Sequence, residues 1–290
     1  MPAGRVRPIE RLLVACASVS IATTAGIVLV LAIESIAFFQ SVSLREFLAD
    51  STWTPRMHDP HFGVRPLVAG TLLTSGIAVL VALPTGLLAA IYLGEFASAR
   101  AQRLLKPALE LLAGVPTIVY GYFALLVVTP LLQSFVPNVG GYNALGPGIV
   151  LGIMIVPIIC SLSEEAIRSV PHHLREAAYA LGAGKLQTIF RVVLPTASRA
   201  ITASVILGLS RAAGETMIVA IAAGTQPRLT LDPREPVETM TAQLLQVELG
   251  NIPAGTLDYH AIFAVGALLF AFTFATNATA QLLIGRYRGR

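Results

Sequence analysis

The sequence predicts an all-α integral membrane protein with six transmembrane helices. Of its 290 residues, 55% are hydrophobic and only 12% are charged. The mean hydropathy is +0.74, whereas a soluble domain carries charges at about a quarter of its positions. Several apolar runs also reach the length of about 20 residues that a helix needs to cross the hydrocarbon core. Composition and run length together place most of the chain in lipid.

Six apolar runs are the candidate spans. They are residues 12–39, 66–93, 105–135, 145–162, 201–223 and 259–284. The third run contains Gly114-Val115-Pro116, which predicts a kink or a short interfacial helix before the span, and Pro84 and Pro157 predict bends in two others. We expect residues 1–65 to form the N-terminal tail, the first span and the first outer loop. Residues 66–290 would form a membrane domain with the other five spans.

The distribution of basic residues predicts the orientation of these spans. Fourteen lysines and arginines lie in the two termini and in the second-to-third and fourth-to-fifth connections, against five in the remaining connections. Cytoplasmic loops carry the excess of Lys and Arg, so both termini are expected in the cytoplasm. The net charge of +4 is explained by this asymmetry and gives no reason to expect nucleic acid as a partner.

Other features are read as structural. Cys16 and Cys160 lie in apolar runs without any CxxC or Cys/His spacing, which indicates small buried residues and no metal or redox site. The first run is too long for the apolar part of a signal peptide, which favours a retained span. In the outer loop 224–257, Val237, Met240 and Leu244 are spaced as on one helix face, so residues 237–247 are expected to form an amphipathic helix at the outer surface.

The connection between the fourth and fifth spans is polar and helical in pattern. A helix starting near Pro171 has apolar residues at Leu174, Ala178 and Leu181, and Gly182 would end it. A second amphipathic segment follows and is expected to end at Pro195. Two interpretations are open from pattern alone: an interfacial linker, or a surface that docks another cytoplasmic protein.

The spacing within this connection resembles the EAA signature of ABC importer permeases. It has Glu-Ala-Ala at 176–178, a glycine six positions after the glutamate, and Leu-Pro at 194–195. The resemblance implies a type I ABC importer permease fold in which a cytoplasmic coupling helix, at about 170–195, docks on a separate ATP-binding subunit. The residues that would make this contact are Glu176, Ala177, Ala178, Gly182, Leu194 and Pro195. The chain has no GxxxxGK[ST] sequence, so ATP is expected to be used by the partner, with no cofactor and no catalytic residue here.

Two charged residues lie inside the predicted fifth span. An arginine at the bilayer centre costs about 2.5–3.5 kcal/mol, so Arg211 is expected to face protein or a wet pathway. Glu215 follows four residues later and could pair with it. The pair could simply fasten this helix to its neighbours, or Arg211 could offer its donors to an oxyanion in transit.

Further stretches resemble the permeases of phosphate-specific transport, and their C-type subunit in particular. They are residues 62–67, 70–72, 90–93, 105–110, 113–117, 120–123 and 211–217. This resemblance implies a bacterial inner-membrane heterodimer with an A-type permease, a pair of ATP-binding subunits, and a phosphate-binding protein on the outer face. Arg211 and Glu215 match charged positions that the family places in its translocation path, although Ala213 stands where isoleucine or leucine is frequent.

Two alternatives to phosphate import follow from the same residues. Sulfate or molybdate would bind one arginine equally well, so charge alone does not select the anion. A non-transporting scaffold or a membrane enzyme is the more distant alternative. No nucleophile–base pair or cluster of metal ligands accompanies Arg211 in the sequence, which disfavours the enzyme.

Overall fold

The computed structural model describes residues 6–55, 57–250, 252–253 and 255–288, which are helical over most of their length. Within these ranges six helical stretches are long and apolar enough to cross a membrane. They are Ile9–Ser41, Arg65–Phe96, Thr117–Phe135, Leu145–Arg168, Lys185–Ala213 and Leu257–Leu283. The predicted all-α class with six spans is confirmed. The non-helical pairing found in the described part is a single bridge between Trp53 and Phe62.

Three helices form the centre of the molecule: α3 (Arg65–Ile91), α7 (Leu145–Arg168) and α10 (Leu194–Ala213). Small residues let them approach closely, because a glycine leaves room for a neighbouring chain. Gly208 of α10 packs on Ile159 of α7, and Gly152 of α7 packs on Val81 of α3. Helices α3 and α7 continue through their internal prolines, Pro84 and Pro157.

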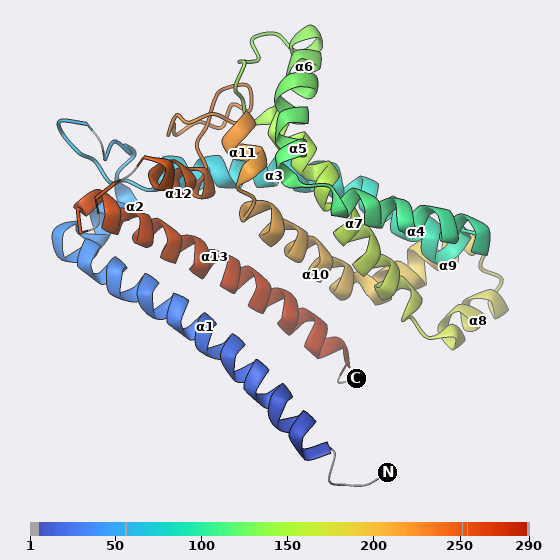
Figure 1. The fold of residues 1–290 in the computed structure, drawn as a ribbon. Coiled ribbons are helices and arrows are strands. Elements are labelled where there is room, and N and C mark those ends of the chain that lie inside the picture. The colour runs from blue at the N-terminus through green and yellow to red at the C-terminus, as the bar shows by residue number, and fades with distance from the viewer. Residues whose placement is uncertain (1–5, 56, 251, 254, 289–290) are drawn as a thin grey trace.

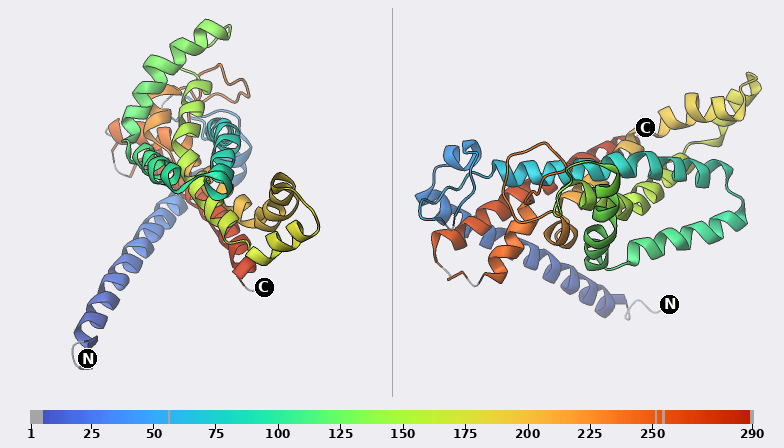
Figure 2. Two further views of the ribbon diagram at one scale, coloured as in Figure 1. Left: turned by 90° about the vertical axis from the view of Figure 1, so that its right-hand side faces the viewer. Right: turned by 90° about the horizontal axis from the view of Figure 1, so that it is seen from above.

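The first and last spans pack beside each other at one edge (Figure 1). They are α1 (Val6–Ser41) and α13 (Leu257–Arg288). Near their outer ends His260 Nδ1 lies 2.8 Å from Glu34 Oε2. The N-terminal end of α1 diverges from the remaining helices (Figure 2). The apolar window of α1 buries none of its residues, whereas that of α7 buries 61%.

The third predicted run, 105–135, is two elements. Helix α4 (Ala99–Gly114) ends before Val115-Pro116, and the span follows as α5 (Thr117–Phe123), the π-helical turn η2 (Ala124–Val128) and α6 (Thr129–Phe135). The predicted start at residue 105 is therefore wrong, whereas a separate helix before the span is confirmed. Val115 is extended, as the residue before a proline prefers, and this breaks the helix.

The fifth span also differs from its prediction. The turns α9 (Lys185–Thr188) and η3 (Ile189–Val193) run directly into α10, so the segment after Gly184 belongs to the span and does not end at Pro195. The π-helical turn η3 lies just before Pro195, where the helix must accommodate a residue without an N–H. The helix then ends at Ala213, and a short helix α11 (Met217–Ala222) follows a break. The predicted single helix over 201–223 is wrong.

The two long loops that are expected on the outer side are partly buried. The loop after α1 contains α2 (Leu44–Ala49) and places Trp53 and Phe62 in a cluster with Met240 and Val265. Helix α12 (Met240–Leu249) begins inside the protein. The predicted surface helix over 237–247 is therefore wrong for its first turns. The carbonyl of Glu238 approaches α3 at Gly70, and the Met240 N–H donates to Thr71 Oγ1 at 3.0 Å.

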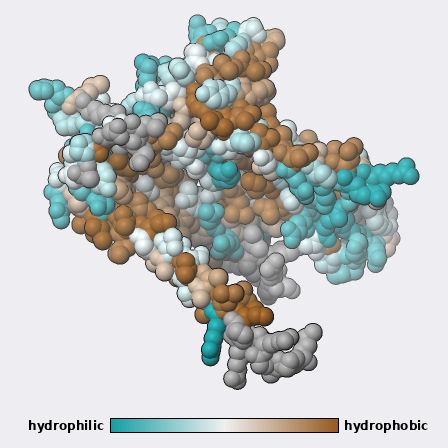
Figure 3. Space-filling model, in the orientation of Figure 1, coloured by the Kyte–Doolittle hydropathy of each residue, from teal (hydrophilic) through white to brown (hydrophobic). Residues whose placement is uncertain are grey.

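Hydrophobic and hydrophilic residues separate along the molecule (Figure 3). Hydrophilic residues gather around α8 (His172–Ala180) and α9 at one end and over the outer loop near residue 55 at the other. Hydrophobic residues dominate the surface between these ends. This distribution is that of a protein whose middle lies in lipid.

Candidate functional site

Arg211 and Glu215 lie at the break between α10 and α11. Nη1 of Arg211 is 3.4 Å from Oε2 of Glu215, and the two side chains are 49% and 4% exposed. Arg211 occupies the last turn of α10, so its predicted position in the middle of a continuous helix is wrong. The predicted pair nevertheless forms. A cation at a helix C-terminus is favourable because the last carbonyls carry partial negative charge.

Glu215 is held from two sides. Its Oε1 accepts a hydrogen bond of 3.2 Å from the Met217 N–H, which starts α11. Its backbone carbonyl accepts one of 2.7 Å from Thr241 Oγ1 at the start of α12. Sequence reasoning missed Thr241, because the spacing in 237–247 favoured a surface helix. The buried carboxylate, fixed in this way, lies beside one guanidinium nitrogen of Arg211, whose side chain stays half exposed.

This arrangement can bind an oxyanion. The guanidinium has five N–H donors and Glu215 lies near one of its nitrogens, at a long distance of 3.4 Å. The remaining donors can reach two oxygens of one ligand, as guanidinium groups do with phosphate or sulfate. No cluster of three or more His, Cys, Asp or Glu side chains with metal-binding placement is found in the described residues.

The EAA-type segment forms helix α8, a glycine turn and α9. The Ala183 N–H donates to the Ala178 carbonyl at 3.0 Å and the Gly182 N–H to Tyr179 at 2.9 Å. These two bonds cap the end of α8, and they require a left-handed residue at Gly182, whose φ is +79°. The predicted glycine terminator is confirmed at this position.

The six residues predicted for the partner contact divide into two groups. Glu176, Ala177 and Gly182 are exposed on α8 and its turn, and Ala178 is 8% exposed. Leu194 and Pro195 begin α10, which follows α9 and η3 along the chain. A groove of about 410 Å³ lies between α8 and the α9–η3 helix and is lined by Leu174, Ala177, Ala178, Leu181, Gly182, Ala183, Gln187, Arg191 and Val192. Leu181, which lines the groove, is 89% exposed, and Leu186 of α9 is 62% exposed.

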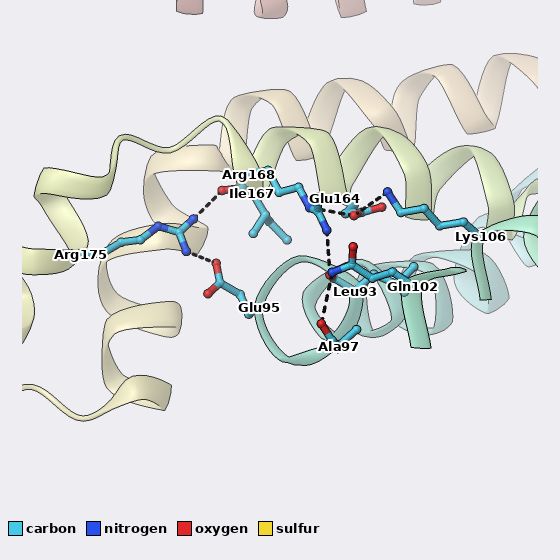
Figure 4. A network of polar contacts seen from close by, with 9 residues as sticks. All are labelled: Leu93, Glu95, Ala97, Gln102, Lys106, Glu164, Ile167, Arg168 and Arg175. Carbon is cyan, nitrogen blue, oxygen red and sulfur yellow. Dashed lines mark hydrogen bonds and ion pairs between the residues drawn. The ribbon is translucent and has the colours of Figure 1, made fainter. Parts of the chain in front are cut away.

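A polar network joins this segment to the ends of the spans (Figure 4). Arg175 of α8 pairs with Glu95, which lies in η1 (Tyr92–Phe96), the π-helical turn that ends α3. Glu164 of α7 pairs with Arg168 at 2.8 Å and with Lys106 of α4 at 2.9 Å. Sequence reasoning did not single out Glu95. An acidic residue directly after a span, in a connection rich in basic residues, is the signal that could have found it.

The outer loops are held by ion pairs of their own. Nδ1 of His61 lies 3.1 Å from Oδ2 of Asp50, and this hydrogen bond raises the pKa of His61 above its ordinary value. Hydrogen bonds from Arg234 lower the pKa of Asp232 to about 2.

Comparison with known proteins identifies the family. The family described as "Binding-protein-dependent transport system inner membrane component" matches residues 82–289. The probable ABC transporter permease protein YqgH of Bacillus subtilis (strain 168) is 34% identical, with 90% of this chain and 84% of the relative covered. The phosphate transport system permease protein PstC of Xylella fastidiosa (strain 9a5c) is also 34% identical, covering 83% and 78%. PstC of Haemophilus influenzae is 33% identical, covering 82% and 80%.

Solved structures share the fold. A bacterial ABC transporter involved in the import of the polysaccharide alginate matches with a TM-score of 0.62 at 16% identity, covering 97% of both chains. The methionine ABC transporter MetNI, in an inward-facing conformation, matches with a TM-score of 0.54 at 19% identity, covering 76% of this chain and 94% of that one. The chain therefore belongs to the inner-membrane components of binding-protein-dependent transport systems, as a multi-pass permease of the type I ABC importer fold.

Proposed function

We propose that the chain is the permease subunit of an ATP-driven importer that moves inorganic phosphate from the outer face to the cytoplasm. One observation carries the proposal: Arg211 stands half exposed at a break in the fifth span, fixed by the buried Glu215. An oxyanion needs such a donor to enter a low-dielectric region. The similarity to two PstC permeases supports phosphate as the cargo.

Glu215 would moderate the affinity of this site. An unpaired arginine in a low-dielectric path would hold an anion too tightly for onward movement, whereas a neighbouring carboxylate reduces its field. The anion would touch Arg211 in passing and continue inward. The chain performs no covalent chemistry in this proposal.

The partners follow from surfaces that the isolated chain leaves exposed. The groove at α8, with Glu176, Ala177, Ala178 and Gly182 on its helix, would receive the ATP-binding subunit, and Leu194 and Pro195 would transmit the motion into α10. An A-type permease would cover the exposed apolar surface of α1 and enclose Arg211 between the two subunits. A phosphate-binding protein would dock on the outer loops. The chain itself would bind no cofactor, and ATP would be used by the partner.

The test is uptake of radiolabelled inorganic phosphate by the complex reconstituted with its partner subunits. Arg211→Gln should reduce uptake to background while the complex still assembles. Arg199→Gln is the matched control, because Arg199 is exposed on the same helix and the described residues offer it no ion pair. Uptake by Arg211→Gln at the level of the unaltered protein would exclude the pathway role.

The rate of ATP hydrolysis distinguishes phosphate from the alternative anions as the cargo. Binding protein loaded with phosphate, sulfate or molybdate is added to the reconstituted complex, and the stimulation of hydrolysis is compared. Phosphate should stimulate and the other two should not. Stimulation by sulfate or molybdate alone would assign the permease to that anion, and stimulation by none of them would favour a scaffold without transport.

A further inference from the structure

Two basic residues of the EAA-type segment converge on one acidic residue at the end of α3. Arg175 of α8 pairs through Nη1 with the Glu95 carboxylate, and the side chains are only 14% and 7% exposed. Lys185, at the start of α9, donates through Nζ to the Glu95 backbone carbonyl at 2.7 Å. Its ammonium also lies 4.3 Å from the centre of the Phe96 ring. The two helices that border the groove are therefore attached to the same turn.

This turn, η1, also receives side chains from two other helices. The Leu93 carbonyl accepts from Arg168 of α7 at 3.3 Å and from Gln102 of α4 at 3.2 Å. Gln102 donates in addition to the Ala97 carbonyl at 3.2 Å. A π-helical turn displaces carbonyls from the regular helical ladder, which leaves them available to such donors. Side chains of α4, α7 and α8 meet the end of α3 here (Figure 4), and Lys185 of α9 joins them through its bond to the Glu95 carbonyl.

Arg175 connects α8 to α7 as well. Its Nη2 donates to the Ile167 carbonyl at 2.8 Å, in the last turn of α7. One planar guanidinium thus joins α8 to the cytoplasmic ends of α3 and α7. Because the Arg175–Glu95 pair is buried, moving α8 away from η1 would leave an uncompensated charge. Displacement of α8 is therefore expected to move the ends of both spans as well.

We propose that Glu95 is the positioning residue through which the EAA-type segment drives the spans: Arg175 and Lys185 fasten α8 and α9 to η1, so that motion imposed on the groove reaches α3 and α7. This rests on the proposed function, in which an ATP-binding subunit pushes on that groove. Helix α7 packs against α10, which carries Arg211, so the route from the groove to the anion site is continuous. The latch is the set Glu95, Arg175 and Lys185.

The test measures coupling in the reconstituted complex. Glu95→Gln keeps the shape of the side chain and removes its charge. The expected result is normal recovery of the ATP-binding subunit and continued ATP hydrolysis, with phosphate uptake per ATP reduced roughly tenfold. Glu165→Gln is the matched control. Glu165 is exposed near the C-terminal end of α7, which is the end that contacts η1, and it has no ion pair among the described residues. Unchanged uptake per ATP in Glu95→Gln would overturn the latch.

A chemical rescue separates the latch from general damage. Glu95→Cys and Arg175→Cys are combined in a background in which Cys16 and Cys160 are alanine, and a short bis-thiol-reactive linker then joins the two positions. The unlinked double variant should be uncoupled, and the linked one should regain most of its uptake per ATP. Failure of the linked variant to recover, despite intact assembly, would count against the latch.

A readout independent of cargo keeps the two proposals distinguishable. Thr216→Cys, in the same cysteine-free background, reports labelling at the α10–α11 break with and without ATP. ATP should change this labelling in the unaltered latch and not in Glu95→Gln. If ATP changes the labelling of the unaltered latch but not that of Glu95→Gln, and no phosphate is taken up, phosphate import is refuted and the latch is upheld. If ATP still changes the labelling in Glu95→Gln, the latch is refuted.

Discussion

Gly70 and Gly76 of α3 show how strongly a single position can depend on its neighbours. A Cβ at Gly70 would clash with the Glu238 carbonyl oxygen, whereas one at Gly76 would have no atom within 4 Å. The first glycine lets the segment before α12 pack into the protein, and that packing brings Thr241 to Glu215. The second has no such role and is open to substitution.

Gly70→Ala should therefore destabilise the protein by about 1–3 kcal/mol, the usual cost of overpacking. Gly76→Ala should be neutral or stabilise it by up to about 1 kcal/mol, because alanine is the better helix former. Thermal unfolding of the two variants in the same detergent measures the difference. Equal melting temperatures would mean that the contact between α3 and Glu238 is not tightly packed.

The functional residues differ in how readily the sequence alone predicts them. Arg211 and Glu215 were identified because charges inside an apolar run are unusual and expensive. Glu95 was not, because charges just beyond a span are common and the sequence does not say which of them meet. Its partners Arg175 and Lys185 lie 80 and 90 positions away along the chain, so only the fold brings the three together.

At the scale of the elements, the six spans were predicted well, but of their interruptions only the one at Gly114-Val115-Pro116 was predicted. Apolar composition marks where a helix can lie in lipid, which is why all six spans were found. At the break after Ala213, Glu215 accepts hydrogen bonds from Met217 and Thr241. The residues on both sides are apolar, so composition alone joins α10 and α11 into one run. The buried start of α12 was missed for the same reason, since an apolar spacing of 3–4 residues suits a protein interior and a membrane surface equally.

The turn between α8 and α9 supports a prediction at this scale. Gly182 has φ +79°, and a side chain there would meet no atom within 4 Å, so any effect must come from backbone strain or from the new side chain in the groove. Left-handed backbone costs a residue with a Cβ about 1–2 kcal/mol. Gly182→Asp should therefore distort the cap of α8, place a carboxylate at the groove, and reduce the amount of ATP-binding subunit that co-purifies.

Gly184→Ala is the control for this prediction. Gly184 lies in the same turn with an ordinary φ of −73° and equally open surroundings. Gly184→Ala should leave the amount of co-purified ATP-binding subunit unchanged. Gly182→Ala would separate the effect of backbone strain from that of the added carboxylate. Full recovery of the ATP-binding subunit with Gly182→Asp would argue that this turn does not contribute to docking.

At the scale of the whole molecule, the chain has two polar ends and an apolar middle (Figure 3). The end that carries α8 and the network around Glu95 is rich in basic residues, and the opposite end carries Trp53 and the start of α12 in a closed cluster. Helix α1 leaves this body and keeps its apolar surface exposed. In a bilayer such an exposed apolar helix can lie against lipid or against another subunit.

The charge asymmetry predicts that the α8 end faces the cytoplasm. Single cysteines at Ser51 in the outer loop and at His173 in α8, both exposed, test this in a background with Cys16 and Cys160 replaced by alanine. A membrane-impermeant maleimide applied to intact cells should label Ser51→Cys and should reach His173→Cys only after the membrane is opened. The reverse pattern would place the groove outside the cell, where no ATP-binding subunit could reach it, and would overturn the coupling proposal along with the orientation.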